Sequence, residues 1–249
     1  MSLKGRIAVI TGASRGLGKA MALALAEDGV RLALVGRDEA QLAATAAEVR
    51  KLGAEAEVFR ADVADESQVR TLEQDVLAKL GRADILINNA GINIRKRMVD
   101  FTLDEWNSIL GTNLTGVFLM CRAFVPHMRG RGYGRVINLT SVMSHVSFPD
   151  RTAYSASKAG LLGFTRALAL ELAGDGVCVV GISPGPFATE MTLPIINDAQ
   201  RNAEFMSQTP MARWGQPEEV GALARFLCSE GAGYITGTDI LIDGGWCAQ

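Results

Sequence analysis

Tyr154 and Lys158 lie four residues apart in a segment, Tyr-Ser-Ala-Ser-Lys, that is typical of a helix. Residues i and i+4 of a helix are about 5–6 Å apart at Cβ, so the ammonium of Lys158 should lie beside the phenol of Tyr154. A free tyrosine titrates near ~10 and is a poor base at neutral pH unless a cation stabilises its phenolate. The spacing therefore predicts a proton-transfer site in which Lys158 lowers the pKa of Tyr154. Taken alone, it fits equally well a helix surface that carries one tyrosine and one lysine.

A second chemical feature is the glycine pattern GxxxGxG formed by Gly12, Gly16 and Gly18, which follows an apolar run at residues 7–10. Glycines at such a strand-to-helix turn let a pyrophosphate approach the helix N-terminus closely. The spacing differs from GxGxxG, and the Gly-Lys-Ser/Thr of a P-loop is absent, which disfavours a kinase or a GTPase. The pattern therefore predicts a dinucleotide site.

Composition limits the classes of partner. The chain has 249 residues, 48% of them hydrophobic and 21% charged, which predicts one soluble α/β domain spanning residues 1–249. A net charge of -2 disfavours nucleic acid and anionic membranes as partners. No charged-then-apolar leader and no uninterrupted apolar run of 18 residues is found, so we expect a cytoplasmic protein.

The cysteines and histidines do not suggest a metal site. The four cysteines are widely spaced, with no CxxC or Cys/His pattern, and the chain has only two histidines, His127 and His145. We therefore expect buried thiols and no bound metal.

Continuous apolar runs alternate with helix-length segments along the chain, which predicts a parallel sheet covered on both faces. We expect a single Rossmann-like, doubly wound α/β fold of about seven strands, and in such folds ligands bind beyond the carboxyl ends of the strands. The predicted strands centre on residues 7–10, 32–35, 58–59, 85–87, 136–139, 177–180 and 240–242. Helix starts are predicted at Asp38, Asp65, Thr102 and Pro217 from capping patterns. One long helix is expected from Thr102 to about Met128, and residues 187–216 are expected to be an irregular substrate loop.

Several short motifs occur in one order along nearly the whole chain. They are TGASRGLG at 11–18, NNAG at 88–91, Asn113, Ser141, YSASK at 154–158 and PG at 184–185. In this order, with Ser141 and Tyr154 13 residues apart, they resemble the short-chain dehydrogenase/reductase family. One departure is visible, because that family often has Asn two strand residues before its Pro-Gly turn, where this chain has Val180-Gly181.

The resemblance implies roles for four catalytic residues. Tyr154 would exchange a proton with the substrate oxygen during hydride transfer. Lys158 would lower the tyrosine pKa and hydrogen-bond the nicotinamide ribose, and Ser141 would donate a hydrogen bond to the substrate oxygen. Asn113 would kink its helix and help to anchor a water that links the lysine to solvent.

The resemblance also implies a nicotinamide dinucleotide site. Its residues are expected to be Gly12, Ser14, Arg15, Gly16, Leu17, Gly18, Arg37, Asp62, Val63, Asn89, Ala90, Gly91, Tyr154, Lys158, Pro184, Gly185 and Thr189. An acid at the end of the second strand would bind the ribose 2′-hydroxyl of NAD(H), but Gly36 stands there. Arg15 and Arg37 could bracket a 2′-phosphate instead, so we expect NADP(H) rather than NAD(H), although Asp38 could neutralise one arginine.

The substrate is expected to be a small carbonyl or alcohol, and its contacts are the least defined part of the site. Candidates are Arg95, Met143, His145 and Phe187; the run from Arg95 to Arg97 and the loop residue His145 are also compatible with plain surface positions.

Three functional hypotheses remain. Residues 141–144 and 209–215 look most like gluconate 5-dehydrogenase and related sugar-acid or polyol dehydrogenases. The alternative is a 3-oxoacyl-acyl-carrier-protein reductase, which residues 113–118 resemble equally well; Gly174-Asp175 stands where those reductases commonly have a basic residue. A nucleotide-binding regulator without turnover is disfavoured because all four catalytic residues are present. The family also implies a homotetramer.

Overall fold

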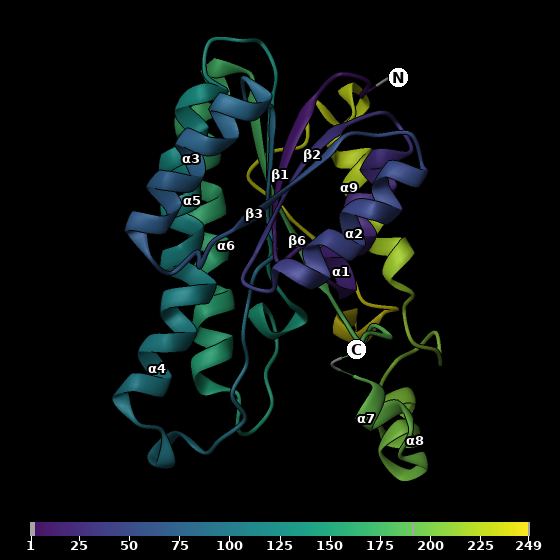
Figure 1. The fold of residues 1–249 in the computed structure, drawn as a ribbon. Coiled ribbons are helices and arrows are strands. Elements are labelled where there is room, and N and C mark those ends of the chain that lie inside the picture. The colour runs from purple at the N-terminus through teal and green to yellow at the C-terminus, as the bar shows by residue number, and fades with distance from the viewer. Residues whose placement is uncertain (1–2, 191, 249) are drawn as a thin grey trace.

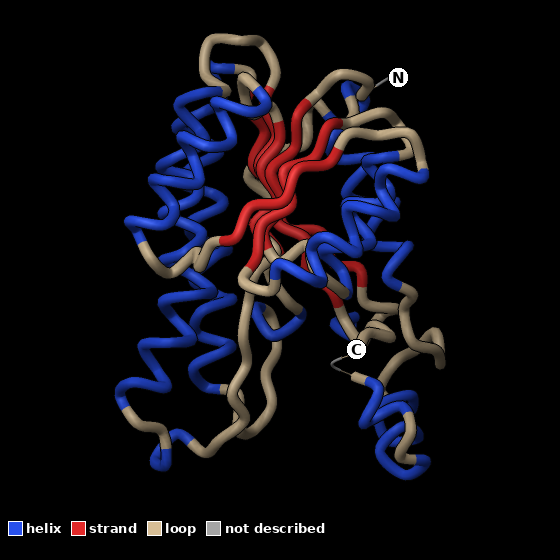
Figure 2. Tube along the Cα trace, viewed as in Figure 1, coloured by secondary structure: helices blue, strands red, loops and turns tan. Residues whose placement is uncertain are grey.

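The computed structural model describes residues 3–190 and 192–248 and shows a parallel sheet between two layers of helices (Figures 1 and 2). In this part of the chain the sheet has seven strands in the order β3-β2-β1-β4-β5-β6-β7. The strands are β1 (Ile7–Thr11), β2 (Arg31–Gly36), β3 (Ala56–Arg60), β4 (Ile85–Asn88), β5 (Gly134–Leu139), β6 (Val177–Pro184) and β7 (Asp239–Ile242). The order reverses between β1 and β4, so the doubly wound α/β prediction is confirmed.

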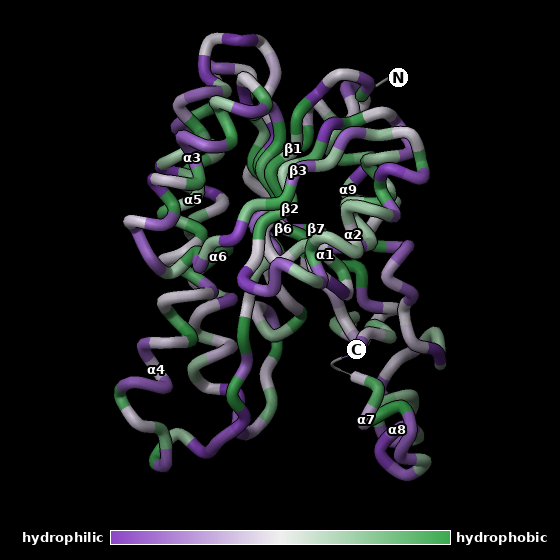
Figure 3. Tube along the Cα trace, in the orientation of Figure 1, coloured by the Kyte–Doolittle hydropathy of each residue, from purple (hydrophilic) through white to green (hydrophobic). Residues whose placement is uncertain are grey.

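Each face of the sheet is covered by its own set of helices (Figure 1). One face carries α1 (Gly16–Ala26), α2 (Glu39–Lys51) and α9 (Pro217–Cys228). The other carries α3 (Glu66–Leu80), α4 (Leu103–Leu110), α5 (Gly116–Phe124) and α6 (Thr152–Leu172). The strands are apolar along their length and the outer helix surfaces are mixed (Figure 3), since only the strands are buried on both sides.

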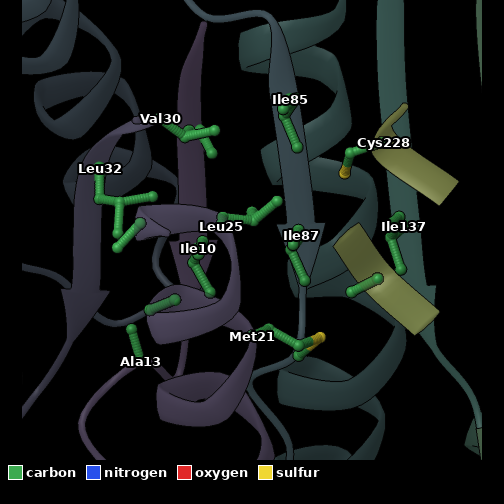
Figure 4. Packing of buried hydrophobic residues seen from close by; sticks show 14 of the residues in the cluster. Ile10, Ala13, Met21, Leu25, Val30, Leu32, Ile85, Ile87, Ile137 and Cys228 are labelled. Carbon is green, nitrogen blue, oxygen red and sulfur yellow. The ribbon is translucent and has the colours of Figure 1, made fainter. Parts of the chain in front are cut away.

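The core therefore consists of two apolar clusters, one on each face of the sheet. In the first, Met21 and Leu25 of α1 pack with Ile10 of β1 and Ile87 of β4, all of them fully buried (Figure 4). This packing fixes where α1 begins relative to the end of β1.

The predicted helix starts are confirmed by their capping contacts. The carboxylate of Asp38 accepts a hydrogen bond from the backbone N–H of Gln41 at 3.1 Å. Asp65 caps α3 in the same way, and Thr102 and Glu105 form a reciprocal capping box at α4.

The expected long helix from Thr102 to about Met128 is present as one helical run, Leu103–His127, although its turn type changes along its length. α4 ends at Leu110, a π-helical turn spans Gly111–Thr115, and α5 is followed by a 3₁₀ turn at Val125–His127. By length and composition the run Leu103–His127 could cross a membrane, but 56% of its most apolar window is buried inside the fold. A core helix of a soluble protein passes the same test.

The stretch at 187–216 is also more ordered than expected. It contains α7 (Leu193–Ile196) and α8 (Ala199–Ser207), while Met191 lies outside the described residues. The ring of Phe205 on α8 stacks on Trp214 at 5.7 Å between centroids and lies 5.7 Å from Trp246. The contact with Trp246 joins residues that are far apart in the sequence. Together these contacts hold α8, with α7 beside it, beyond the carboxyl ends of the strands (Figure 1).

Candidate active site

A cavity of about 880 Å³ lies at the carboxyl ends of the central strands. Most of the predicted site residues line it: Gly12, Ser14, Arg15, Gly16, Leu17, Arg37, Asp62, Val63, Asn89, Ala90, Gly91, Ser141, Tyr154, Lys158, Pro184, Gly185, Phe187 and Thr189. Five other predicted residues are not in its wall: Gly18, Arg95, Asn113, Met143 and His145. The motifs that are far apart in sequence therefore meet at one edge of the sheet.

The three glycines of the loop stand at positions where a side chain would be strained or would clash. Gly12 and Gly16 have φ angles of +64° and +55°, in the left-handed region that favours glycine. A Cβ on Gly18 would lie 2.3 Å from the carbonyl oxygen of Gly12, so Gly18 acts by packing beneath the loop. The N-terminus of α1 then opens on the cavity, an arrangement that fits the pyrophosphate of a dinucleotide.

Thr11 holds the glycine loop against the strand beside it, a role that the sequence reasoning missed. Its hydroxyl oxygen accepts hydrogen bonds from the backbone N–H groups of Asn89 at 3.0 Å and Ala90 at 3.1 Å. The Asn89 side chain in turn donates to the carbonyl of Gly12 at 3.0 Å. The signal was available, because Thr11 opens the TGASRGLG motif at the end of the first strand.

At the far end of the cavity, Gly36 is the last residue of β2, as expected. Arg37 lies 3.6 Å from the carboxylate of Asp62, and Arg15 lies 3.6 Å from that of Glu190. The acid beside Arg37 is thus Asp62 rather than Asp38. Both guanidinium groups are well exposed, and exposed pairs of this length are weak, so both arginines can turn toward an anion.

The catalytic tyrosine and lysine share one face of α6, and Ser141 follows the end of β5. Lys158 is 4% exposed, and its ammonium donates to the carbonyl of Leu139. The Lys158 nitrogen lies 5.8 Å from the centre of the Tyr154 ring. The i, i+4 juxtaposition predicted from the spacing is therefore present.

Burial is the largest cause of the pKa shifts of Tyr154 and Lys158. Burial raises the pKa of Tyr154, while a hydrogen bond with Ser141 and the charge of Arg151 lower it. Burial also lowers the pKa of Lys158, to about 8. The ammonium of Lys158 donates to the carbonyl of Leu139, and the role expected of it toward Tyr154 stays a prediction. Arg151, three residues before Tyr154, was not anticipated in this role.

Asn113 lies in the π-helical turn and is fully buried. Its side-chain oxygen accepts from the N–H of Ile92 at 2.8 Å, and its amide donates to the carbonyl of Ile92 at 2.9 Å and to Ser157 at 3.0 Å. The Ser157 hydroxyl donates to the carbonyl of Tyr154 at 2.7 Å. Asn113 therefore ties the segment after β4 to the helix that carries the catalytic pair.

His145 faces away from the cavity, so the structure does not support the predicted substrate contact. Its Nε2 lies 2.8 Å from the carboxylate of Asp239 on β7, which also accepts from the hydroxyl of Thr140 at 2.6 Å. A Cβ at Gly181 would lie 2.0 Å from the same carboxylate. The departure from the family pattern at Val180-Gly181 is thereby explained, because Gly181 leaves room for Asp239.

Of the remaining substrate candidates, only Phe187 lines the cavity. Phe187 is 5% exposed and lines the cavity, and its ring packs where a side chain on Gly215 would lie. Met143 contributes its backbone N–H, which donates to the Ser141 hydroxyl at 3.1 Å. Arg95 is exposed outside the cavity wall. Among the described residues, no group of three or more His, Cys, Asp or Glu side chains could hold a metal ion.

Comparison with known proteins gives consistent matches over the full chain. A family model described as Enoyl-(Acyl carrier protein) reductase matches residues 12–247. A 3-oxoacyl-[acyl-carrier-protein] reductase of Synechocystis is 43% identical over 248 residues, which cover 98% of each protein.

Two solved structures show the same fold. A gluconate 5-dehydrogenase from Burkholderia cenocepacia, in complex with NADP and tartrate, has a TM-score of 0.94 and 35% identity and covers 100% of this chain and 97% of its own. A short-chain type dehydrogenase/reductase from Mycobacterium marinum has a TM-score of 0.94 and 37% identity, covering 100% and 98%.

Proposed function

Because the chain belongs to the short-chain dehydrogenase/reductase family and is an oxidoreductase of that family, we propose that it interconverts a carbonyl and a secondary alcohol with NADP(H), acting on a sugar acid or polyol. The observation that carries this proposal is the meeting of Ser141, Tyr154 and Lys158 at one end of a cavity whose other end holds the glycine loop. With a dinucleotide bound along this cavity, a proton donor and a hydride source would meet at one reacting carbon–oxygen bond.

The roles follow from the positions of the groups. Bound NADP(H) would supply or accept the hydride. The phenol oxygen of Tyr154 gives a proton to the carbonyl oxygen during reduction and takes it back during oxidation. Ser141 donates a hydrogen bond to the same oxygen, which stabilises the charge that develops there. Lys158, held by Leu139, orients the ribose.

The preference for NADP(H) is supported by Gly36 at the end of β2 and by Arg15 and Arg37, which both line the cavity. The Burkholderia relative was solved with NADP.

A carrier-protein reductase is the second candidate, favoured by the identity to the Synechocystis protein. Such an enzyme needs a basic docking surface for its acidic carrier. Just before the start of β6, where those reductases commonly have a basic residue, this chain instead has Asp175, whose carboxylate pairs with Arg129 at 2.6 Å. We therefore rank the sugar-acid activity first. A regulator without turnover ranks last, because the complete catalytic set is in place.

The proposal is tested by steady-state assays over sugar acids, polyols, ketoacids, quinones and acetoacetyl thioesters with both cofactors, using Tyr154→Phe as the inactive control. We expect turnover of a sugar acid or polyol with NADP(H). Turnover of acetoacetyl thioesters alone would select the carrier-protein reductase, and no turnover with any probe would refute the proposal.

We also propose that the enzyme is a cytoplasmic homotetramer without nucleic-acid or membrane partners.

A further inference from the structure

Two arginines, Arg95 and Arg151, lie near the phenol of Tyr154. Arg151 is the N-cap residue of α6, three positions before Tyr154, so the two side chains are neighbours on one helix face. The backbone N–H of Lys96 donates to the carbonyl of Asp150 at 3.3 Å, which joins the segment after β4 to the start of α6. This contact brings Arg95 close to Arg151.

The two arginines have like charges and form no ion pair in the described part of the chain, although the charge of Asp150 also acts on Arg151 and raises its pKa. Lys96, between Arg95 and Arg97, is paired with Glu105, whereas no described carboxylate lies within ion-pair distance of Arg95 or Arg151. The charge of Arg95 adds to burial in lowering the pKa of Arg151. Two guanidinium groups held together in this way favour an anion between them.

Two buried polar atoms without a partner among the described residues lie in the two joined segments, after β4 and at the start of α6, although only Asn93 is in the cavity wall and Arg151 is not. Nη1 of Arg151 and Oδ1 of Asn93 are both buried with no hydrogen-bond partner in the described part of the chain, and Asn93 lines the cavity. Leaving such atoms unpaired is costly, so each needs a partner, which a water molecule or a ligand can supply. The arginine requires an acceptor and the amide oxygen requires a donor.

We infer that Arg151, assisted by Arg95, binds a carboxylate of the substrate, and that Asn93 accepts a hydrogen bond from a substrate hydroxyl. This inference rests on the proposed carbonyl chemistry at Tyr154, one helical turn away. The carboxylate and the reacting carbonyl would then be held by two different residues, as suits a hydroxylated sugar acid that carries them on separate carbons. The planar guanidinium suits a carboxylate because it can donate two parallel hydrogen bonds.

A binding experiment tests the subsite without turnover. Tartrate and threitol, which share a carbon skeleton but differ in their carboxylates, are titrated calorimetrically into protein saturated with NADP⁺. We expect tartrate to bind more tightly than threitol, and Arg151→Gln to weaken tartrate by about 10-fold or more while threitol is unaffected. Arg151→Lys should retain part of the affinity because it keeps the charge.

Arg166→Gln is the matched control, since Arg166 is an exposed arginine on the same helix whose Nε donates to the carbonyl of Leu162. It should leave tartrate affinity unchanged. Equal tartrate affinity in wild type and Arg151→Gln overturns the inference, as do equal losses for tartrate and threitol. Inorganic phosphate that binds as tightly as tartrate, with the same dependence on Arg151, would also overturn it in favour of a phosphate site.

A kinetic experiment separates this inference from the proposed function. The probes are 5-ketogluconate and L-sorbose, which carry the carbonyl at the same carbon but differ in the carboxylate. We expect Arg151→Gln to raise KM for 5-ketogluconate alone. If neither compound nor any other carbonyl is reduced, yet tartrate binding still depends on Arg151, the proposed function fails and the carboxylate subsite stands.

Discussion

We propose that the substrate exchanges a proton with the phenol of Tyr154, whose pKa burial raises, so that it is protonated at neutral pH. Removing only its hydroxyl, as in Tyr154→Phe, should lower kcat by about 10²-fold to 10⁴-fold, the usual contribution of general acid–base catalysis. NADPH affinity should stay nearly constant, because the ring is retained. Single-turnover kinetics and NADPH fluorescence titration measure both; a variant that keeps more than about a tenth of wild-type turnover would contradict the assignment.

Because of Lys158, the free energy of unfolding should rise with pH above about pH 8. Burial lowers its pKa from 10.5 to about 8 in the folded state. Below pH 8 the lysine is protonated in both states, and keeping the charge buried costs roughly 3 kcal/mol of unfolding free energy, from about 1.4 kcal/mol per pH unit. Between about pH 8 and 10.5 the unfolded chain binds more protons, so this cost disappears as pH rises.

The measurement is denaturant unfolding of wild type and Lys158→Met at pH 7.5 and pH 10. Relative to the methionine variant, wild type should gain most of this free energy at the higher pH. A difference between the two proteins that does not change with pH would show that Lys158 is not buried as a charge.

Arg37 should contribute to the affinity for NADPH but not to the affinity for NADH. Charge-assisted hydrogen bonds are worth about 1.5–3 kcal/mol, so Arg37→Ala should weaken NADPH by about 10-fold to 150-fold. NADH has no 2′-phosphate, and its affinity should barely change. Parallel titrations test this; equal losses would mean that Arg37 supports the adenine end through its contact with Asp62 instead.

At the scale of elements, β6 and β7 pair with Gly181 opposite Asp239. Gly181→Ala should cost about 1–3 kcal/mol of unfolding free energy, because the added methyl would meet the Asp239 carboxylate. In an Asp239→Ala background the same change should cost much less, so the double mutant should cost less than the sum of the two single mutants in a double-mutant cycle.

Gly163→Ala is the matched control for this cycle, since a Cβ at that position in α6 meets nothing within 4 Å. It should be neutral or stabilising, as alanine is in a helix interior. Additive costs at Gly181 and Asp239 would show that the strands separate to accept the methyl.

Local patterns predicted the elements well, and contacts between distant residues account for what they missed. Apolar runs and capping residues located the seven strands and the starts of the main helices. At the π turn after Leu110, Asn113 bonds to the distant Ile92, and α8 depends on Phe205 contacting Trp214 and Trp246. No periodicity contains such information.

The features of the site likewise fall into those that local motifs predict and those that depend on contacts between distant residues. Short motifs located the groups that line the cavity, because each motif is contiguous and follows a strand. The pairing of His145 with Asp239 joins residues 94 positions apart, and the unpaired state of Arg151 is a property of the folded surroundings. Neither is visible until the chain is folded.

At the scale of the molecule, two separate regions expose large apolar side chains. On the helices of one face these are Leu103 at 72%, Phe118 at 44% and Leu170 at 82% exposed. Around the sheet edge they are Phe226 at 49%, Tyr234 at 102% and Leu241 at 42% exposed. Two such regions suit two different twofold contacts, which together generate a tetramer.

Light scattering should therefore give about four times the 26.5 kDa of one chain. Leu170→Glu should break one contact and leave a dimer, because burying a charge there is unfavourable. A mass of one chain for the wild type at micromolar concentration would exclude the tetramer.

The ends of the described chain lie at opposite ends of the sheet (Figure 1). Leu3 precedes β1, at the edge away from the cavity, whereas the residues up to Ala248 lie on the cavity side, where Trp246 packs against Phe148 and Phe205. A solid support joined ahead of Leu3 would hold the enzyme with its cofactor entrance facing the solution. The same support joined after Ala248 would crowd the aromatic rings that carry α8, so the amino end is the side from which to build an immobilised catalyst or an electrode-bound sensor.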